Sequence, residues 1–213
     1  MSETDYLADE RRRILAAALP ALPFDGWNER LLAEAARSAG VEVDRARLAF
    51  PRGVVDLLEF HLAEADRTML EAFEASRPET LKVRERIALA IRLRLEQQAS
   101  NREGIRRALA LLAQPQNAGL ALKSLYRTVD AIWYAAGDTS TDFNFYTKRI
   151  LLAGVYSATL LYWLDDKSEA FANTWAFLDR RIEDVMRVQR ARGRLGRLAE
   201  RLPNPFRVLR PRA

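Results

Sequence analysis

Apolar residues recur at helical spacing along most of the chain, and the alternation typical of β-strands is scarce. This spacing defines stretches at residues 14–19, 31–36, 54–73, 81–95, 105–112, 120–134, 150–164 and 175–188. Proline and glycine separate them, at Pro20, Pro23, Gly40, Pro51, Gly53, Pro78, Pro115 and Gly137. The pattern predicts an all-α bundle of nine to ten helices.

Residues 28–50 follow the pattern helix, turn, helix. A small apolar face ends before the turn at residues 38–41, and a short second helix is predicted to begin near Glu42. Small residues before a glycine turn let two helices cross closely, as in helix-turn-helix units. With the apolar stretch ahead of it and Phe50-Pro51-Arg52-Gly53 behind it, this layout resembles the N-terminal domain of TetR-type repressors.

The charges of this unit argue against DNA binding. Between Asp25 and Phe60 there are five basic and seven acidic residues, and Glu42 and Asp44 open the second helix, where a major-groove reader carries groups compatible with phosphates or bases. Arg45 and Arg47 remain available for phosphate contacts. We favour a repressor-like fold that does not bind DNA, the alternative being a plain three-helix packing unit.

Net charge is distributed unevenly along the 213 residues. Residues 187–213 hold nine arginines and one glutamate, whereas the preceding residues hold 25 basic and 28 acidic side chains. The net charge of +5 therefore describes a mildly acidic body with a basic tail. We divide the chain into a helix-turn-helix-like unit (1–53), an all-α domain (54–186) and a basic amphipathic tail (187–213).

Several classes of chemistry are excluded by composition. The chain has no cysteine and one histidine, His61, which excludes zinc fingers, iron–sulfur clusters, thiol nucleophiles and paired-histidine metal sites. It also lacks the GxGxxG, GK[ST] and HExxH motifs. We expect a protein that is not an enzyme, with no catalytic residue, metal or cofactor, and with His61 hydrogen-bonded and partly buried in a long helix.

Aromatic and polar residues concentrate in the second half of the chain, most densely between Gly137 and Arg149. Gly137 is predicted to end one helix, and Thr141 or Asp142 to cap the next. On that next helix, helical spacing places Asp142, Phe145, Tyr146 and Arg149 on one face, opposite Phe143, Ile150, Leu151 and Gly154. Two aromatic rings between an acid and an arginine are typical of a protein-binding hot spot, and packing against a neighbouring helix is an equal alternative.

The run from Ala136 to Arg149, AGDTSTDFNFYTKR, closely resembles the hallmark of a family of lipid-binding accessory proteins. These are the coenzyme Q (ubiquinone) biosynthesis proteins numbered nine in that pathway, which have a TetR-type fold. Further likeness lies in LYWLDD at 161–166 and TWAFLDRRI at 174–182, so that the resemblance covers roughly residues 10–188.

This resemblance implies a homodimer that holds a lipid, an isoprenoid or quinone precursor, in an apolar cavity of its C-terminal domain. Members of the family are not enzymes and present ubiquinone precursors to the di-iron demethoxyubiquinone hydroxylase. The family's partner-binding patch maps onto Asp142, Asn144, Phe145, Tyr146 and Arg149.

The basic tail has two stripes at helical spacing, one of arginines and one of apolar residues. Adjacent basic and apolar stripes are typical of a helix lying in an anionic membrane interface. The predicted membrane-binding residues are Arg187, Arg190, Arg194, Leu195, Arg197, Leu198, Arg201 and Leu202. Because Gly193 and Gly196 each cost a helix about 1 kcal/mol relative to alanine, we expect a tail that folds on the membrane. A nucleic-acid-binding tail and a merely solubilising tail are the alternatives.

Acidic residues occupy positions 3, 5, 9 and 10, a composition opposite to that of a transit peptide. The longest uncharged run, 150–164, is shorter than the roughly 20 residues of a membrane span and indicates a buried core helix. We therefore expect a cytoplasmic protein, peripheral on the inner membrane of a bacterium. The expected function is non-catalytic presentation of isoprenoid quinone precursors, and the alternative is a TetR-type ligand-responsive repressor.

Overall fold

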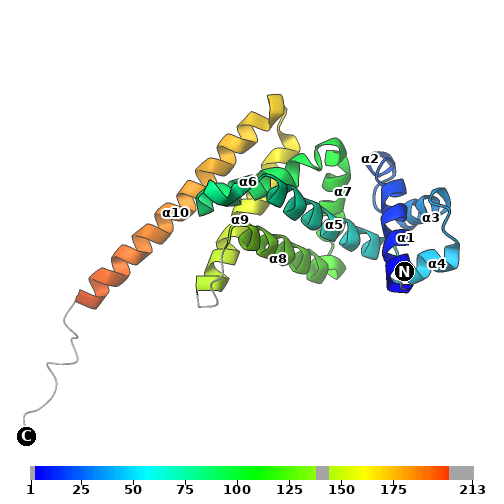
Figure 1. Cartoon of the computed structure of the whole chain (residues 1–213), viewed down its shortest axis with the longest axis horizontal. Helices are drawn as coiled ribbons and strands as arrows, with labels where there is room; N and C mark the ends of the chain where they lie inside the picture. The colour runs from blue at the N-terminus through cyan, green and yellow to red at the C-terminus, as the bar shows by residue number, and fades with distance from the viewer. Residues whose placement is uncertain (1–2, 138–143, 202–213) are drawn as a thin grey trace, which may run out of the picture.

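The computed structural model describes residues 3–137 and 144–201, with side chains from 6 to 137 and from 146 to 187. This part of the chain forms ten α-helices and no strand (Figure 1), which confirms the predicted all-α fold. Single turns of 3-10 helix at Pro78–Thr80, Ala99–Asn101, Pro115–Asn117 and Glu169–Phe171 precede α6, α7, α8 and α10. The helices are α1 (Glu3–Ala18), α2 (Leu22–Asp25), α3 (Glu29–Ser38), α4 (Val43–Ala49), α5 (Val54–Ala75), α6 (Val83–Glu96), α7 (Arg102–Leu112), α8 (Ala118–Ala135), α9 (Asn144–Asp165) and α10 (Ala172–Arg201).

Glycines that were predicted to separate the helices lie at helix ends. Gly40, Gly53 and Gly137 all have positive φ angles, of 65°, 62° and 83°, which glycine adopts without steric cost. Gly53 has a second constraint, because the Glu29 carboxylate lies over it and accepts a hydrogen bond from the Val54 amide (2.8 Å). Helix α3 thereby caps the N-terminus of α5.

Two hydrophobic cores share α5. The first lies among α1, α3, α4 and the beginning of α5, where Leu57 and Leu58 are fully buried. The second lies among the end of α5, α6, α8, α9 and α10, and it contains Met69, Phe73 and the fully buried Trp163. In Figure 1, α1 to α4 form one end of the molecule, and α5 runs from them into the larger bundle. Helix α5 starts at residue 54, where the second domain was predicted to begin. The first core nevertheless extends past this residue into α5.

His61 lies at the junction of the two cores. Its ring centroid is 5.4 Å from that of Trp27, whose indole Nε1 donates to the Gly104 carbonyl (2.9 Å) and so ties the N-terminal unit to α7. Burial, with a smaller contribution from Arg94, lowers the pKa of His61 to about 4. The expectation of a hydrogen-bonded, partly buried histidine is wrong, since the residue is fully buried and its Nε2 finds no partner among the described residues.

Helix α10 extends beyond the body of the protein (Figure 1). Helix α10 continues through Gly193 and Gly196 to Arg201. The structure thus differs from the prediction, based on these two glycines, that the tail is unfolded in water. The neighbouring leucine, alanine and arginine residues have high helix propensities and offset the glycines. Within the described residues, no helix is long and apolar enough to cross a membrane. Helix α9 contains the run predicted to be a buried core helix, but only one side of it is buried: Leu152, Val155 and Trp163 lie inside, whereas Ile150 and Leu161 are exposed.

The constraint at Gly53 gives a direct test of the fold. A Cβ atom at residue 53 would lie 2.2 Å from Glu29 Oε1, whereas one at residue 40 would meet nothing within 4 Å. Gly40→Ala therefore incurs only backbone strain, and we expect it to lower the free energy of unfolding by about 1 kcal/mol. Gly53→Ala also displaces the cap of α5, and we expect about 2–3 kcal/mol. Urea denaturation measures both, and equal losses would refute the role of Glu29.

Candidate functional site

The predicted partner-binding patch lies at the start of α9. Asp142 is outside the described residues, and Asn144 and Phe145 form the first turn of α9, with side chains that are not described. Tyr146 is 65% exposed, so its ring is accessible to a partner. The patch therefore remains a prediction, of which the structure gives the exposure of Tyr146 and Arg149.

Arg149 faces the protein interior. It is buried, and its guanidinium donates to the Asp130 carboxylate of α8 through Nε (2.8 Å) and Nη2 (2.5 Å). Ile150 and Gly154, expected on the opposite face, are exposed. The predicted face is thus rotated: α9 packs on α8 through Arg149, which places Tyr146, Ile150 and Gly154 toward solvent. Arg149 thus holds α9 against α8.

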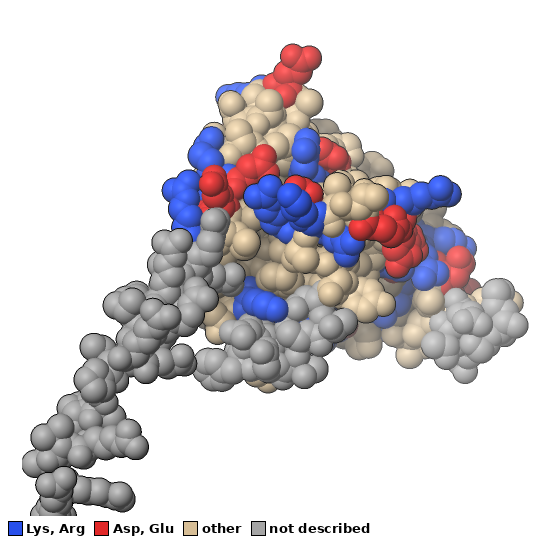
Figure 2. Space-filling view, turned by 60° about the vertical axis from the view of Figure 1, so that its left-hand side comes forward, with Lys and Arg blue, Asp and Glu red and all other residues tan. Residues whose placement is uncertain are grey.

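Two arginines of the helix-turn-helix-like unit, Arg45 and Arg52, are tightly paired with acids. Arg45, one of the two candidates for phosphate contact, makes two hydrogen bonds to the Glu10 carboxylate of α1, of 3.0 and 2.9 Å. Arg47, the other candidate, is exposed and lies 3.6 Å from Asp44. Arg52 binds Asp56 and Glu59 of α5. On the face that Figure 2 shows, basic and acidic side chains are interspersed over the described surface and form no patch of one sign. These contacts agree with the expectation that the unit is a poor DNA binder.

An apolar cavity of about 280 Å³ lies among α5, α6, α7, α8 and α9. A smaller hollow of about 30 Å³ shares its leucine walls and extends to Trp163. The leucines of the larger cavity are Leu62, Leu109, Leu112, Leu125 and Leu160, and its polar lining consists of Arg94, Ser124, Thr128, Tyr156 and Ser157. A mostly apolar cavity with a few convergent polar groups is the usual form of a small-molecule site.

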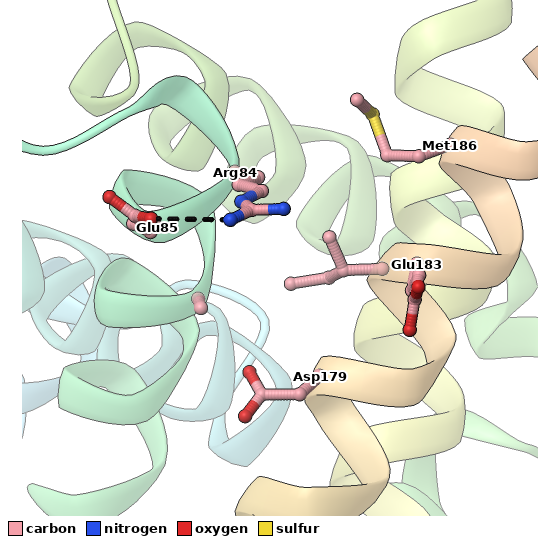
Figure 3. Close-up of a pocket in the computed structure, with 7 residues that line it drawn as sticks. Arg84, Glu85, Asp179, Glu183 and Met186 are labelled. Atoms are coloured by element: carbon pink, nitrogen blue, oxygen red, sulfur yellow. Dashed lines mark ion pairs between the residues drawn. The ribbon is translucent and has the colours of Figure 1, made fainter. Parts of the chain in front are cut away.

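A groove of about 330 Å³ lies between α6 and α10 (Figure 3). Asp179, Glu183 and Met186 of α10 line one side, and Arg84 and Glu85 of α6, an ion pair of 3.6 Å, line the other. An apolar pocket of about 100 Å³ adjoins this groove and contains Trp133, with the Lys148 ammonium 5.7 Å from its ring centroid. The apolar pocket lies where α10 leaves the body. No group of three or more potential metal ligands occurs in the described residues.

The LYWLDD and TWAFLDRRI motifs join α9 to α10. Asp166 accepts hydrogen bonds from the backbone amides and hydroxyl groups of Ser168 and Thr174, at 2.6 to 2.8 Å. Burial alone would raise the pKa of Asp166, but these four bonds lower it to about 2. Arg102 of α7 donates to the last carbonyls of α9, those of Trp163 and Leu164. These residues are structural, and they fix the angle between the last two helices.

The all-α architecture, with a helix-turn-helix-like unit at one end of a larger bundle, defines a TetR-type fold. A crystal structure of a TetR transcriptional regulator from Nitrosomonas europaea matches it with a TM-score of 0.68 and 25% identity, over 82% of this chain and 97% of that one. This likeness confirms the predicted fold class.

Sequence comparison identifies similar proteins. The COQ9 family model matches residues 118–189, from α8 into α10. The chain is 36% identical to the ubiquinone biosynthesis protein COQ9, mitochondrial, of rat, over 86% of this chain and 62% of that protein. The human protein of that name is 34% identical over 86% and 60%. The resemblance is thereby confirmed: this chain carries a COQ9 family domain and spans about three-fifths of the length of these relatives.

The expected localisation is contradicted by these relatives. The proteins from rat, cattle, human and fruit fly are all named as mitochondrial, which points to mitochondria and not to the inner membrane of a bacterium. The expectation rested on the acidic composition of the first ten residues, which does not identify a compartment.

The Asp166 network gives a prediction for stability. Asp166→Ala removes the acceptor of four hydrogen bonds at the α9–α10 corner, and we expect it to lower the free energy of unfolding by about 2 kcal/mol at pH 7. Because the folded state depresses this pKa, the stabilisation is present above about pH 4 and is lost as the pH falls toward 2. Urea denaturation at pH 7 and pH 3 should show the two proteins converging at the lower pH. A difference that does not change with pH would contradict the assignment.

Proposed function

We propose that this protein is a non-catalytic accessory protein of ubiquinone biosynthesis, which binds an isoprenoid quinone precursor and presents it to a di-iron hydroxylase at a membrane surface. One observation carries the proposal: the COQ9 match covers α8 and α9, two helices that wall the apolar cavity, and includes Tyr146. Ligand cavity and partner surface thus belong to the same pair of helices. The reaction itself is assigned to the partner enzyme.

The cavity supports the lipid-binding part of this proposal. Its volume of about 280 Å³ is close to the lower end of the range for small-molecule sites, enough for a ring or part of a chain. Its leucines come from α5, α7, α8 and α9, so a bound apolar chain would contact most of the bundle. Burial of apolar ligand surface gains roughly 25 cal/mol per Å².

The docking part rests on the beginning of α9. We propose that Asp142, Asn144, Phe145 and Tyr146 contact the hydroxylase, and that Arg149 positions them through Asp130. This ion pair between α8 and α9, in which Arg149 is buried and Asp130 is half exposed, holds the exposed tyrosine in one place, as a hot-spot residue requires.

Membrane attachment is proposed for the extended end of α10. Its arginines and leucines, from Arg187 to Leu202, would lie in an anionic interface, each arginine contributing about 1 kcal/mol. We also propose a homodimer through the solvent face of α9, where Ile150 and Leu161 are exposed on either side of Gly154. Exposed aliphatic side chains on a helix are typical of such interfaces.

The alternative, a ligand-responsive repressor, is favoured by the TetR-type fold alone. Fold does not imply function, and pairing Arg45 with Glu10 and Arg52 with Asp56 engages two arginines that DNA binding would need.

Replacing the exposed tyrosine tests the docking surface. We expect Tyr146→Ala to weaken binding to the di-iron hydroxylase tenfold or more, because a central aromatic anchor carries a large share of the binding energy. Tyr126→Ala removes another exposed tyrosine, on α8, and should leave affinity unchanged. Biolayer interferometry measures both, with melting temperatures as the folding control. Wild-type affinity in Tyr146→Ala would exclude this surface.

Reversing charges tests the membrane helix. We expect a triple variant of the full chain to bind anionic vesicles at least hundredfold more weakly in co-sedimentation. The variant combines Arg190→Glu, Arg194→Glu and Arg197→Glu. Each arginine contributes about 1 kcal/mol of binding, and each glutamate adds repulsion. The matched control reverses Arg30, Arg37 and Arg47, which are exposed on the N-terminal unit. Equal losses in the two triple variants would show that net charge alone, and not the helix, determines binding.

A further inference from the structure

A buried polar cluster borders the apolar cavity. The Asp66 carboxylate of α5 accepts from Arg94 Nε of α6 (3.0 Å), Arg127 Nε of α8 (2.9 Å) and the Thr128 hydroxyl of α8 (2.8 Å). Asp66, Arg94 and Thr128 are all buried, and about a third of the Arg127 side chain is exposed (32%). Two guanidinium groups share one carboxylate, so the cluster carries an excess of one positive charge beside an apolar space.

Hydrogen-bond donors in this region exceed the acceptors that the described residues supply. The Ser124 side chain is buried and lines the cavity, yet its Oγ has no hydrogen-bond partner, and Nη2 of Arg127 has none either. The hydrogen bond of Arg94 to Asp66 uses Nε, which leaves its terminal amino groups for another acceptor. A buried donor without an acceptor costs stability, and Ser124 Oγ is such a donor in the cavity lining, so the cavity is suited to a ligand that brings an acceptor.

Tyr156 of α9 completes the polar end of the cavity. It lies in the lining with Arg94 of α6 and Ser124 of α8, so the polar side chains of the cavity come from three helices. Burial raises the pKa of the Tyr156 phenol, opposed in part by Arg94, and the hydroxyl group is therefore protonated and able to donate. Leu62, Leu109, Leu112 and Leu160 form the remainder of the space.

We propose that this cavity binds an amphiphile by an acceptor oxygen at its polar end, placed against Arg94, Ser124 and Tyr156, with its apolar chain along the leucines. The shared chemistry is that of a carboxylate, a phenolate or a quinone carbonyl. An amphiphile with a cationic, donor-only head would meet like charge and no acceptor, and it is rejected. This inference rests on the proposed function, since it specifies which end of the carried lipid the protein recognises.

Matched amphiphiles test the proposal with the full chain. Isothermal titration below the critical micelle concentration compares dodecanoate, a decyl-substituted benzoquinone and dodecylammonium. We expect dodecanoate or the quinone to bind at least tenfold more tightly than dodecylammonium. The better of the two identifies the source of the acceptor oxygen, a fatty acid carboxylate or a quinone ring.

Ser124→Ala separates recognition from folding. It removes a buried hydroxyl group without a partner, so the variant should be at least as stable as the wild type and yet bind the acceptor amphiphiles about tenfold more weakly. Ser38→Ala, at an exposed serine of α3 outside the cavity, is the control and should bind normally.

Equal binding of dodecanoate and dodecylammonium, or unchanged affinity in Ser124→Ala, would overturn the head-group proposal and leave the accessory function standing. Absence of binding by all three probes would also overturn it. The accessory function is judged separately, by hydroxylase binding in Tyr146→Ala.

Discussion

The buried carboxylate of Asp66 is the interaction on which the C-terminal bundle depends. A buried charge is tolerated only when it is paired and hydrogen-bonded, and Asp66 satisfies this by binding Arg94 of α6 together with Arg127 and Thr128 of α8. The three helices are thereby held around this polar cluster. Leucine packing alone would bring them closer together. The cavity lies beside this cluster and has Arg94 and Thr128 in its lining, so residues that stabilise the bundle also supply polar groups to the cavity.

The N-terminal unit has the shape of a DNA-binding domain, and its contacts attach it to the C-terminal bundle. Helix α5 belongs to both cores, Glu29 caps it from α3, and Trp27 binds the Gly104 carbonyl of α7. Helix α7 in turn contributes Leu109 and Leu112 to the cavity. The unit therefore braces the cavity wall, while ion pairs such as Arg45–Glu10 engage arginines that DNA would need.

Helical periodicity and turn residues predicted the helices and their ends well, as Gly53 and Gly137 illustrate, because spacing and backbone conformation are local properties. The orientation of α9 was not predictable in the same way. Spacing gives the angle between Tyr146 and Arg149, but the contact with Asp130 decides which of them faces solvent.

The cavity residues come from five helices and share no motif. One signal was present, since Asp66 and Arg94 are charged residues at positions where helical spacing expects apolar ones. Charged residues on an apolar face indicate a buried polar cluster. The composition of the first ten residues, in contrast, carried no information on localisation.

Native mass spectrometry of the full chain, purified without detergent from cells that make ubiquinone, tests the central claim most directly. The account predicts one bound amphiphile per chain, with fragmentation that identifies an isoprenoid-substituted quinone or phenol. Ligand-free protein that also takes up none of the same lipid from vesicles would contradict it, because a bundle with this cavity would then have no cargo to present.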